Sequence, residues 1–224
     1  MTILALEFSS GQRSVAVANG NSVLSEAVET GGRNTAAFGM IERVLAEAKI
    51  EREQIDAIAV GLGPGSYTGI RSAIAIAQGW QLARKIKLLG VSSAEAIAAQ
   101  AQSEKIFGDV NVVVDAQRGE IYLARYEISE EAVKEIGPLR IANPLDCGDM
   151  SPLSKRGHVR ALQNIFIGPE ATKWFPAGKV IFPRAAAVAR LAAGRSDFIS
   201  SEKLEPIYLR ETSFVKAVRP KTAI

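Results

Sequence analysis

The fold is constrained most by a pattern that occurs twice along the chain. In each copy an apolar strand ends at an acidic residue, Glu7 in the first copy and Asp115 in the second. A tight turn that contains a Gln-Arg pair then leads into another strand. Residues that recur in the same order are typical of an internal duplication. We therefore predict two related α/β units in one chain.

The first half is predicted to hold three antiparallel strands followed by alternating helices and strands. Asn19-Gly20 between two apolar runs indicates a hairpin, and Asn34 and a Ser92–Glu95 capping box are expected to begin helices. From periodicity and turn residues, we expect strands at 3–8, 14–18, 23–30, 55–60 and 88–91, and helices over 35–49, 69–85 and 92–101. The order is therefore βββαβα with a further strand and helix.

The second half begins in the same way and then becomes irregular. We expect strands at 110–114, 120–126, 134–141, 164–167 and 179–182, an irregular segment at 143–160, and an alanine-rich helix over 184–193. The predicted fold class is α/β, with two duplicated βββαβα lobes at 1–104 and 105–224 and the second lobe shortened. We expect the last segment to pack back on the first lobe.

A glycine-rich turn joins the strand at 55–60 to the following helix. Four glycines and Pro64 lie within Gly61–Gly69, and Ser66 or Thr68 can cap the helix. A phosphate-binding P-loop needs Lys-Ser/Thr after the last glycine, where this chain has Ile70-Arg71. A hydrolase nucleophile elbow needs glycines two places either side of Ser66, and these are absent. A rigid strand-to-helix corner and an anion contact through Arg71 remain as alternatives.

Composition predicts a globular protein with a well-filled core. The chain has 224 residues, of which 47% are apolar, a net charge of +3 and one cysteine, Cys147. The small positive charge does not argue for nucleic-acid binding, and one cysteine cannot form an internal disulfide. The start lacks the features of a signal peptide and no apolar run is long enough to span a bilayer. We therefore expect a soluble, cytoplasmic protein without a membrane partner.

The duplicated acidic turns resemble those of the actin, sugar kinase and Hsp70 superfamily (ASKHA). Within it, the chain is similar to the bacterial TsaB (YeaZ) family over almost its whole length. The matching motifs are Leu4–Ser10, Gly63–Arg71, Val91–Ser93, Asp115–Tyr122 and Pro206–Arg210. The Gly-Pro-Gly-Ser-Tyr-Thr-Gly-Ile-Arg run is the most specific of these motifs.

The resemblance implies a non-catalytic subunit in the synthesis of threonylcarbamoyladenosine at position 37 of tRNAs that read ANN codons. Such proteins bind a homologous catalytic subunit, TsaD, and the ATPase TsaE completes the complex, while TsaC supplies threonylcarbamoyl-adenylate. The resemblance further implies tRNA contact through the complex. A helix pair that binds a homologous lobe can also bind its own copy, so homodimer and monomer stay open as alternatives when the partner is absent. The resemblance implies no cofactor required by this chain, with ATP or ADP bound in the complex.

Pairing in the family uses the first two helices of the N-terminal lobe, which correspond here to 35–49 and 69–85. The predicted partner interface is therefore Ala37, Met40, Ile41, Val44, Ala73, Ala77 and Trp80. The glycine loop is expected to present the second helix through Gly63, Pro64, Gly65, Ser66, Thr68, Gly69 and Arg71. The alternative is that the small-residue edge of this helix packs only inside its own lobe.

The resemblance also assigns a vestigial nucleotide cleft. Its residues are Glu7, Ser9, Ser10, Asp115, Arg118 and Gly168. The family usually has Asp-Thr where this chain has Glu7-Phe8, and His-Ser where it has Asn34-Thr35. Only Gly168-Pro169 remain of the glycine-rich adenosine loop of the superfamily. We therefore expect weak nucleotide binding and no metal site.

Two enzymatic alternatives and one binding alternative stay open. The first is a stand-alone kinase or ATPase of the same fold, which the two acidic turns favour. The second is a metallopeptidase, which needs clustered ligands, whereas the chain offers one histidine, His158, and Cys147. The third is RNA contact through Arg33, Arg71 and Arg118. The ordinary interpretation is that these are three solvated surface arginines.

Overall fold

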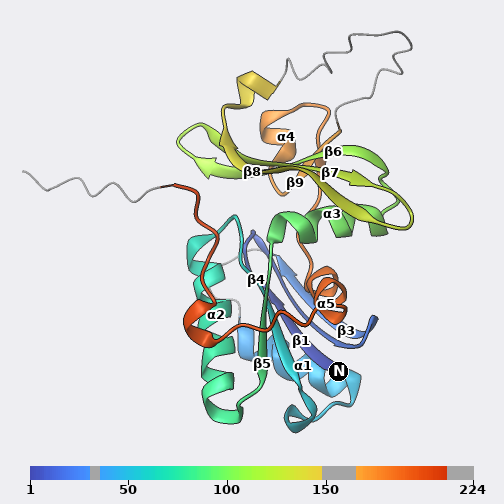
Figure 1. The fold of residues 1–224 in the computed structure, drawn as a ribbon, viewed down its shortest axis with the longest axis vertical. Coiled ribbons are helices and arrows are strands. Elements are labelled where there is room, and N and C mark those ends of the chain that lie inside the picture. The colour runs from blue at the N-terminus through green and yellow to red at the C-terminus, as the bar shows by residue number, and fades with distance from the viewer. Residues whose placement is uncertain (31–35, 148–164, 211–224) are drawn as a thin grey trace, which may run out of the picture.

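The computed structural model describes residues 1–30, 36–147 and 165–210. The predicted N-cap Asn34, the arginine Arg33 and the histidine His158 lie outside these ranges. The described residues form two five-stranded sheets, each with its own helices (Figure 1).

The first sheet has the strand order β3-β2-β1-β4-β5. Its strands are β1 (Thr2–Glu7), β2 (Gln12–Asn19), β3 (Ser22–Thr30), β4 (Ala57–Gly61) and β5 (Lys87–Val91). The first three strands are antiparallel neighbours, while β4 is parallel to β1 and β5 is parallel to β4. The helices of this half are α1 (Ala37–Ala48), α2 (Tyr67–Arg84) and α3 (Ser93–Ser103), with a 3₁₀ turn, η1 (Arg52–Gln54).

The second sheet repeats this topology in the order β10-β9-β6-β7-β8. Its strands are β6 (Gly108–Gln117), β7 (Glu120–Ile128), β8 (Val133–Ala142), β9 (Ile165–Gly168) and β10 (Lys179–Val180). Again three antiparallel strands are followed by two that run parallel to the first. The remaining elements are η2 (Pro144–Cys147), α4 (Ala171–Trp174), α5 (Ala185–Ala193) and η3 (Ser201–Lys203). The predicted duplication is confirmed in the strand order of the two sheets, and the first half has the predicted βββαβα order followed by a further strand and helix.

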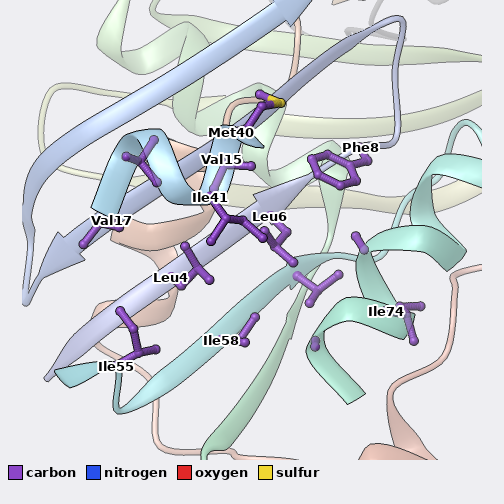
Figure 2. Packing of buried hydrophobic residues seen from close by; sticks show 14 of the residues in the cluster. Leu4, Leu6, Phe8, Val15, Val17, Met40, Ile41, Ile55, Ile58 and Ile74 are labelled. Carbon is purple, nitrogen blue, oxygen red and sulfur yellow. The ribbon is translucent and has the colours of Figure 1, made fainter. Parts of the chain in front are cut away.

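Consecutive residues of β1, β2 and β4 are buried, and because their side chains alternate between the two faces of the first sheet, both faces are apolar. One face contributes Leu4, Leu6 and Ile58 to a core with α1 and α2 (Figure 2). The other face carries small residues such as Ala5, Ala16 and Ala59, against which the alanine-rich helix α5 packs. Small side chains on both surfaces let this helix lie close to the sheet.

Two helices cross between the halves of the chain. Helix α3 packs on the second sheet and also touches α5, which packs on the first sheet (Figure 1). The start of α5 is tied to β3, because Arg184 donates to both carboxylate oxygens of Glu26 at 3.2 and 2.6 Å. The Ala186 N–H donates to the same carboxylate at 3.0 Å. These links hold the two halves together.

The predicted capping box at Ser92 and Glu95 is wrong. Ser92 occupies the N-cap of α3, but its side chain makes no capping hydrogen bond. The Glu95 carboxylate instead lies in the field of Arg195, while burial raises the pKa of Glu95. The Arg195 guanidinium itself pairs with Asp197 at 2.5 Å.

The segment after α5 runs along the first lobe. Ile199 forms a β-bridge with Leu88 of the edge strand β5, and the Ile207 N–H donates to the Leu62 carbonyl at 2.8 Å. Tyr208 stacks on Tyr67 with ring centroids 5.2 Å apart. Within the described ranges, no helix combines the length and the apolar character needed to cross a membrane.

Candidate functional site

The glycine loop is a tight joint between α2 and the turn after β1. A Cβ added at Gly65 would overlap the Ser9 carbonyl oxygen, and one added at Gly69 would overlap the Phe8 carbonyl oxygen. The Ser66 N–H donates to the Ser9 carbonyl at 2.6 Å. Glycine is therefore required at these two places because backbone meets backbone there. The loop fixes where α2 begins relative to the sheet.

The helix cap predicted at Ser66 is confirmed. Ser66 is the N-cap of α2 and its Oγ accepts a hydrogen bond from the Gly69 N–H at 3.4 Å. Arg71 is exposed, donates to the Tyr67 hydroxyl at 2.6 Å and lies 5.2 Å from the centroid of that ring. Thr68 is exposed in the first helical turn, while Pro64 is buried in the loop. The geometry supports the rigid-corner interpretation of the loop.

Glu7 is part of this joint and faces no open cleft. Its side chain is fully buried, one carboxylate oxygen accepts the Ser9 N–H at 2.7 Å, and the other accepts the Ser93 hydroxyl at 2.8 Å. The Ser93 oxygen in turn accepts the Gly63 N–H at 3.1 Å. Burial raises the pKa of Glu7, although the hydrogen bonds from Ser9 and Ser93 oppose the shift. The assignment of Glu7 and Ser9 to a nucleotide cleft is therefore wrong for this structure, because both are buried within the joint.

The second acidic turn is neutralised by its own chain. Asp115 accepts the Gln117 N–H at 2.7 Å with one oxygen and pairs with the Lys173 ammonium at 2.6 Å with the other. Glu170 accepts the Asp115 N–H at 3.4 Å, and burial raises the pKa of the Glu170 carboxyl. Lys173 of the same chain therefore supplies the positive charge at this turn, where the superfamily resemblance implied a metal and phosphates.

Of the other residues predicted for the cleft, Ser10 and Gly168 have local structural roles and Arg118 is exposed. Ser10 closes the turn after β1, donating to the Gln12 carbonyl at 2.8 Å and accepting the Gln12 N–H at 3.2 Å. Gly168 lies where a Cβ would overlap the Val113 carbonyl oxygen, so packing requires a glycine there. Arg118 is exposed in the second turn. The hydrogen bonds to the Glu7 side chain come from Ser9 and Ser93, and neither Ser10 nor Asp115 contributes one.

Clustered metal ligands are not found in the described part of the chain, where no group of three or more His, Cys, Asp or Glu side chains could hold an ion. Cys147 is buried at the end of η2, and burial raises the pKa of its thiol. A thiol held in its protonated form is a poor nucleophile and a poor metal ligand.

Most of the predicted partner interface is core. The residues Met40, Ile41, Val44, Ala73 and Ala77 are at most 2% exposed and pack against the first sheet. Apolar periodicity identifies the side of a helix that is buried, and here that side faces the protein's own sheet (Figure 2). The interface prediction is therefore wrong for Met40, Val44, Ala73 and Ala77, which are core. Ile41 is 2% exposed but lines the groove described next, together with the partly exposed Ala37 and Trp80.

A groove of about 950 Å³ lies between the outer sides of α1 and α2. Phe38, which is 66% exposed, Ile76 and Trp80 give it an apolar lining, and small residues of α2 lie beside them. The lining residues that the sequence analysis missed include the helix residues Phe38, Ser72, Ala75, Ile76, Gly79 and Ala83, and the charged residues Arg13, Arg52, Glu53 and Arg84. Thr68, Ser72, Ala75, Gly79 and Ala83 recur at three and four residues, so their spacing would have revealed this second face of α2.

Two lobes of equal strand order, held together by crossing helices, define the fold class shared by actin, the sugar kinases and Hsp70. Residues 34–144 match the family model of TsaD, described as tRNA N6-adenosine threonylcarbamoyltransferase. YeaZ from Pseudomonas aeruginosa has a similar solved structure, with a TM-score of 0.77 and 25% identity over 93% of this chain and 99% of that one.

The relatives agree with the structural match. The chain is 32% identical to tRNA threonylcarbamoyladenosine biosynthesis protein TsaB of Escherichia coli over 134 residues, which is 59% of this chain and 58% of the relative. It is 26% identical to the TsaB of Haemophilus influenzae over 94% of both chains. The chain is thus similar to TsaB (YeaZ) proteins, over most of its length in two of these comparisons.

Proposed function

We propose that this protein is a non-catalytic subunit in the synthesis of N6-threonylcarbamoyladenosine at position 37 of tRNAs that read ANN codons. It binds a TsaD-like catalytic subunit through the groove between α1 and α2. The observation that carries the proposal is this mainly apolar groove, bounded by the exposed Phe38 and by Trp80, on a chain similar to TsaB proteins. Exposed apolar patches of this kind mark protein interaction sites.

The identity of the partner is argued from the similarity of the chain to TsaD itself. The matched region, 34–144, contains both helices that form the groove. Two subunits of one fold can present the same helix pair to each other across an approximate two-fold axis, as in an isologous dimer. The same argument leads us to propose that the groove forms a homodimer when the partner is absent.

The state of the two acidic turns supports placing the chemistry on the partner. The Glu7 carboxylate accepts hydrogen bonds from Ser9 and Ser93, and Asp115 is paired with Lys173. Carboxylates satisfied in this way offer little to a nucleotide or its metal. In the proposed complex, a TsaE-like ATPase handles ATP or ADP, a TsaC-like enzyme supplies threonylcarbamoyl-adenylate, and tRNA is reached through the assembled subunits.

Reconstitution tests the function. The purified chain is mixed with the TsaD-like and TsaE-like proteins of the same organism, tRNA and a source of threonylcarbamoyl-adenylate, and the modified adenosine is measured by mass spectrometry. We expect modification to require this chain. An unchanged rate without it would refute the proposal, and ATP turnover by the chain alone would favour the stand-alone kinase or ATPase.

A surface variant tests the groove. Phe38→Ala removes the most exposed aromatic ring of the lining and is expected to weaken binding of the TsaD-like subunit at least tenfold, as truncation of a central aromatic does at other interfaces. Leu145→Ala is the control, because Leu145 is 85% exposed on η2 of the other lobe. Equal affinity of both variants in titration calorimetry would reject the placement. Ala73→Arg is unsuitable, because a buried arginine at that position would unfold the lobe.

A further inference from the structure

Helix α2 contains two glycines within its length, and only one is explained by the chain itself. Gly69 is required because the Phe8 carbonyl lies against it. Gly79 lies on the exposed side of the helix in its C-terminal half, and a Cβ added there would meet nothing within 4 Å. A mid-helix glycine is unfavourable compared with alanine because of its greater backbone freedom in the unfolded chain. Nothing among the described residues compensates for this cost.

The surroundings of Gly79 show what its missing side chain leaves open. It lines the groove, with Ser72, Ala75 and Ala83 on the same side of α2. Trp80, the next residue, and Phe38 on α1 supply large apolar rings to the same lining. The backbone of α2 is thus accessible at Gly79, which has no side chain and lies between residues that do. Helices whose contact residues are small approach most closely.

We propose that Gly79 is the point where a helix of the partner crosses α2 with the two backbones in contact. This inference rests on the proposed function and goes beyond it, because it names the residue that selects the partner. Only a partner helix that carries a small residue at the crossing point fits there, since a side chain on either helix separates the backbones. A partner with a large residue at that place is excluded by its shape.

Three variants test the inference, each with the isolated chain and with the TsaD-like subunit. Gly79→Ala is expected to raise the Tm of the isolated chain by about 2 °C while weakening the complex about tenfold. Gly79→Leu is expected to weaken it at least a hundredfold. Gly39→Ala is the matched control, because Gly39 is an exposed glycine on α1 outside the groove lining. It should raise Tm similarly and leave the Kd within twofold.

The outcomes separate this inference from the proposed function. If the unaltered chain binds the TsaD-like subunit and Gly79→Leu binds within twofold of it, the crossing point is refuted while the function stands. If the unaltered chain does not bind, the proposed function fails and the inference fails with it. A rise in Tm together with a loss of affinity for Gly79→Ala supports the inference, because a glycine outside the contact would raise Tm and leave the affinity unchanged.

Discussion

Replacement of Glu7 by Gln should change how stability depends on pH. The pKa of the Glu7 carboxyl is raised above its ordinary value of 4.5 by burial, so the folded state holds this proton more tightly than the unfolded state does. The resulting stabilisation is fully present below about pH 4.5 and is lost as the pH rises through the folded-state pKa. Gln carries no such proton, so its variant does not lose this contribution.

The magnitude follows from linkage. Between pH 4.5 and the folded-state pKa, the free energy of unfolding of the unaltered chain should fall relative to Glu7→Gln by up to about 1.4 kcal/mol per pH unit. Glu7→Ala should instead cost at least about 2 kcal/mol, because the Ser9 N–H and the Ser93 hydroxyl lose their acceptor in a buried site. Above pH 4.5 the free energy of unfolding should therefore rise relative to the unaltered chain in Glu7→Gln, which removes a buried charge. It should fall in Glu7→Ala, which removes hydrogen bonds.

Urea denaturation followed by circular dichroism measures both effects. The difference between the unaltered chain and each variant is taken at several pH values from 4.5 to 8, so that other titrating groups cancel. Glu127→Gln, on the exposed side of β7, is the control. A Glu7→Gln curve parallel to that of the unaltered chain across this range would refute the argument that burial disfavours the charged carboxylate.

Two further stability predictions concern the joints of the fold and are measured by the same denaturation. Gly69→Ala should lower the free energy of unfolding by about 2 kcal/mol because its Cβ would overlap the Phe8 carbonyl, whereas Gly11→Ala, with nothing within 4 Å, should change it by less than about 0.5 kcal/mol. Arg184→Ala should cost about 1–3 kcal/mol because it breaks two hydrogen bonds to the largely buried Glu26; Arg52→Ala, which breaks an exposed pair with Glu42, should cost under about 1 kcal/mol. Equal losses within either pair would contradict the packing argument.

The sequence was sufficient for the fold because its signals there are local. Strand periodicity, the Asn19-Gly20 hairpin and the two acidic turns each follow from neighbouring residues, and together they predicted two lobes of one topology. Some bounds differ, since β6 runs over Gly108–Gln117 and continues through the acidic turn residue Asp115. The alternation that marks a strand does not by itself mark the residue where pairing stops.

The candidate site was harder to predict because it depends on residues distant in sequence. The hydroxyl that binds Glu7 comes from Ser93, 86 positions away, and the ammonium that pairs with Asp115 comes from Lys173, 58 positions away. No local sequence pattern distinguishes a carboxylate that already has hydrogen-bond or ion-pair partners from one that is free to bind a metal. The prediction of the partner interface failed for another reason. An apolar stripe such as Met40 and Val44 indicates that a helix face is buried, but it does not tell whether the protein's own sheet or a partner buries it.

The glycine loop and the groove belong to one argument, because a docking face is useful only when its helices are held in place. At its start α2 is fixed by the Ser66 contact with Ser9, and near its end the Gln78 amide donates to the Ser201 carbonyl at 2.8 Å. The Ser201 N–H donates in return to the Gln81 side chain at 3.1 Å. A surface fixed at both ends loses little conformational freedom when a partner binds, which leaves more of the contact energy for affinity. In this chain the joint around the buried Glu7 therefore holds α2 in place. The helix in turn holds Gly79 in a fixed position for contact with the proposed partner helix.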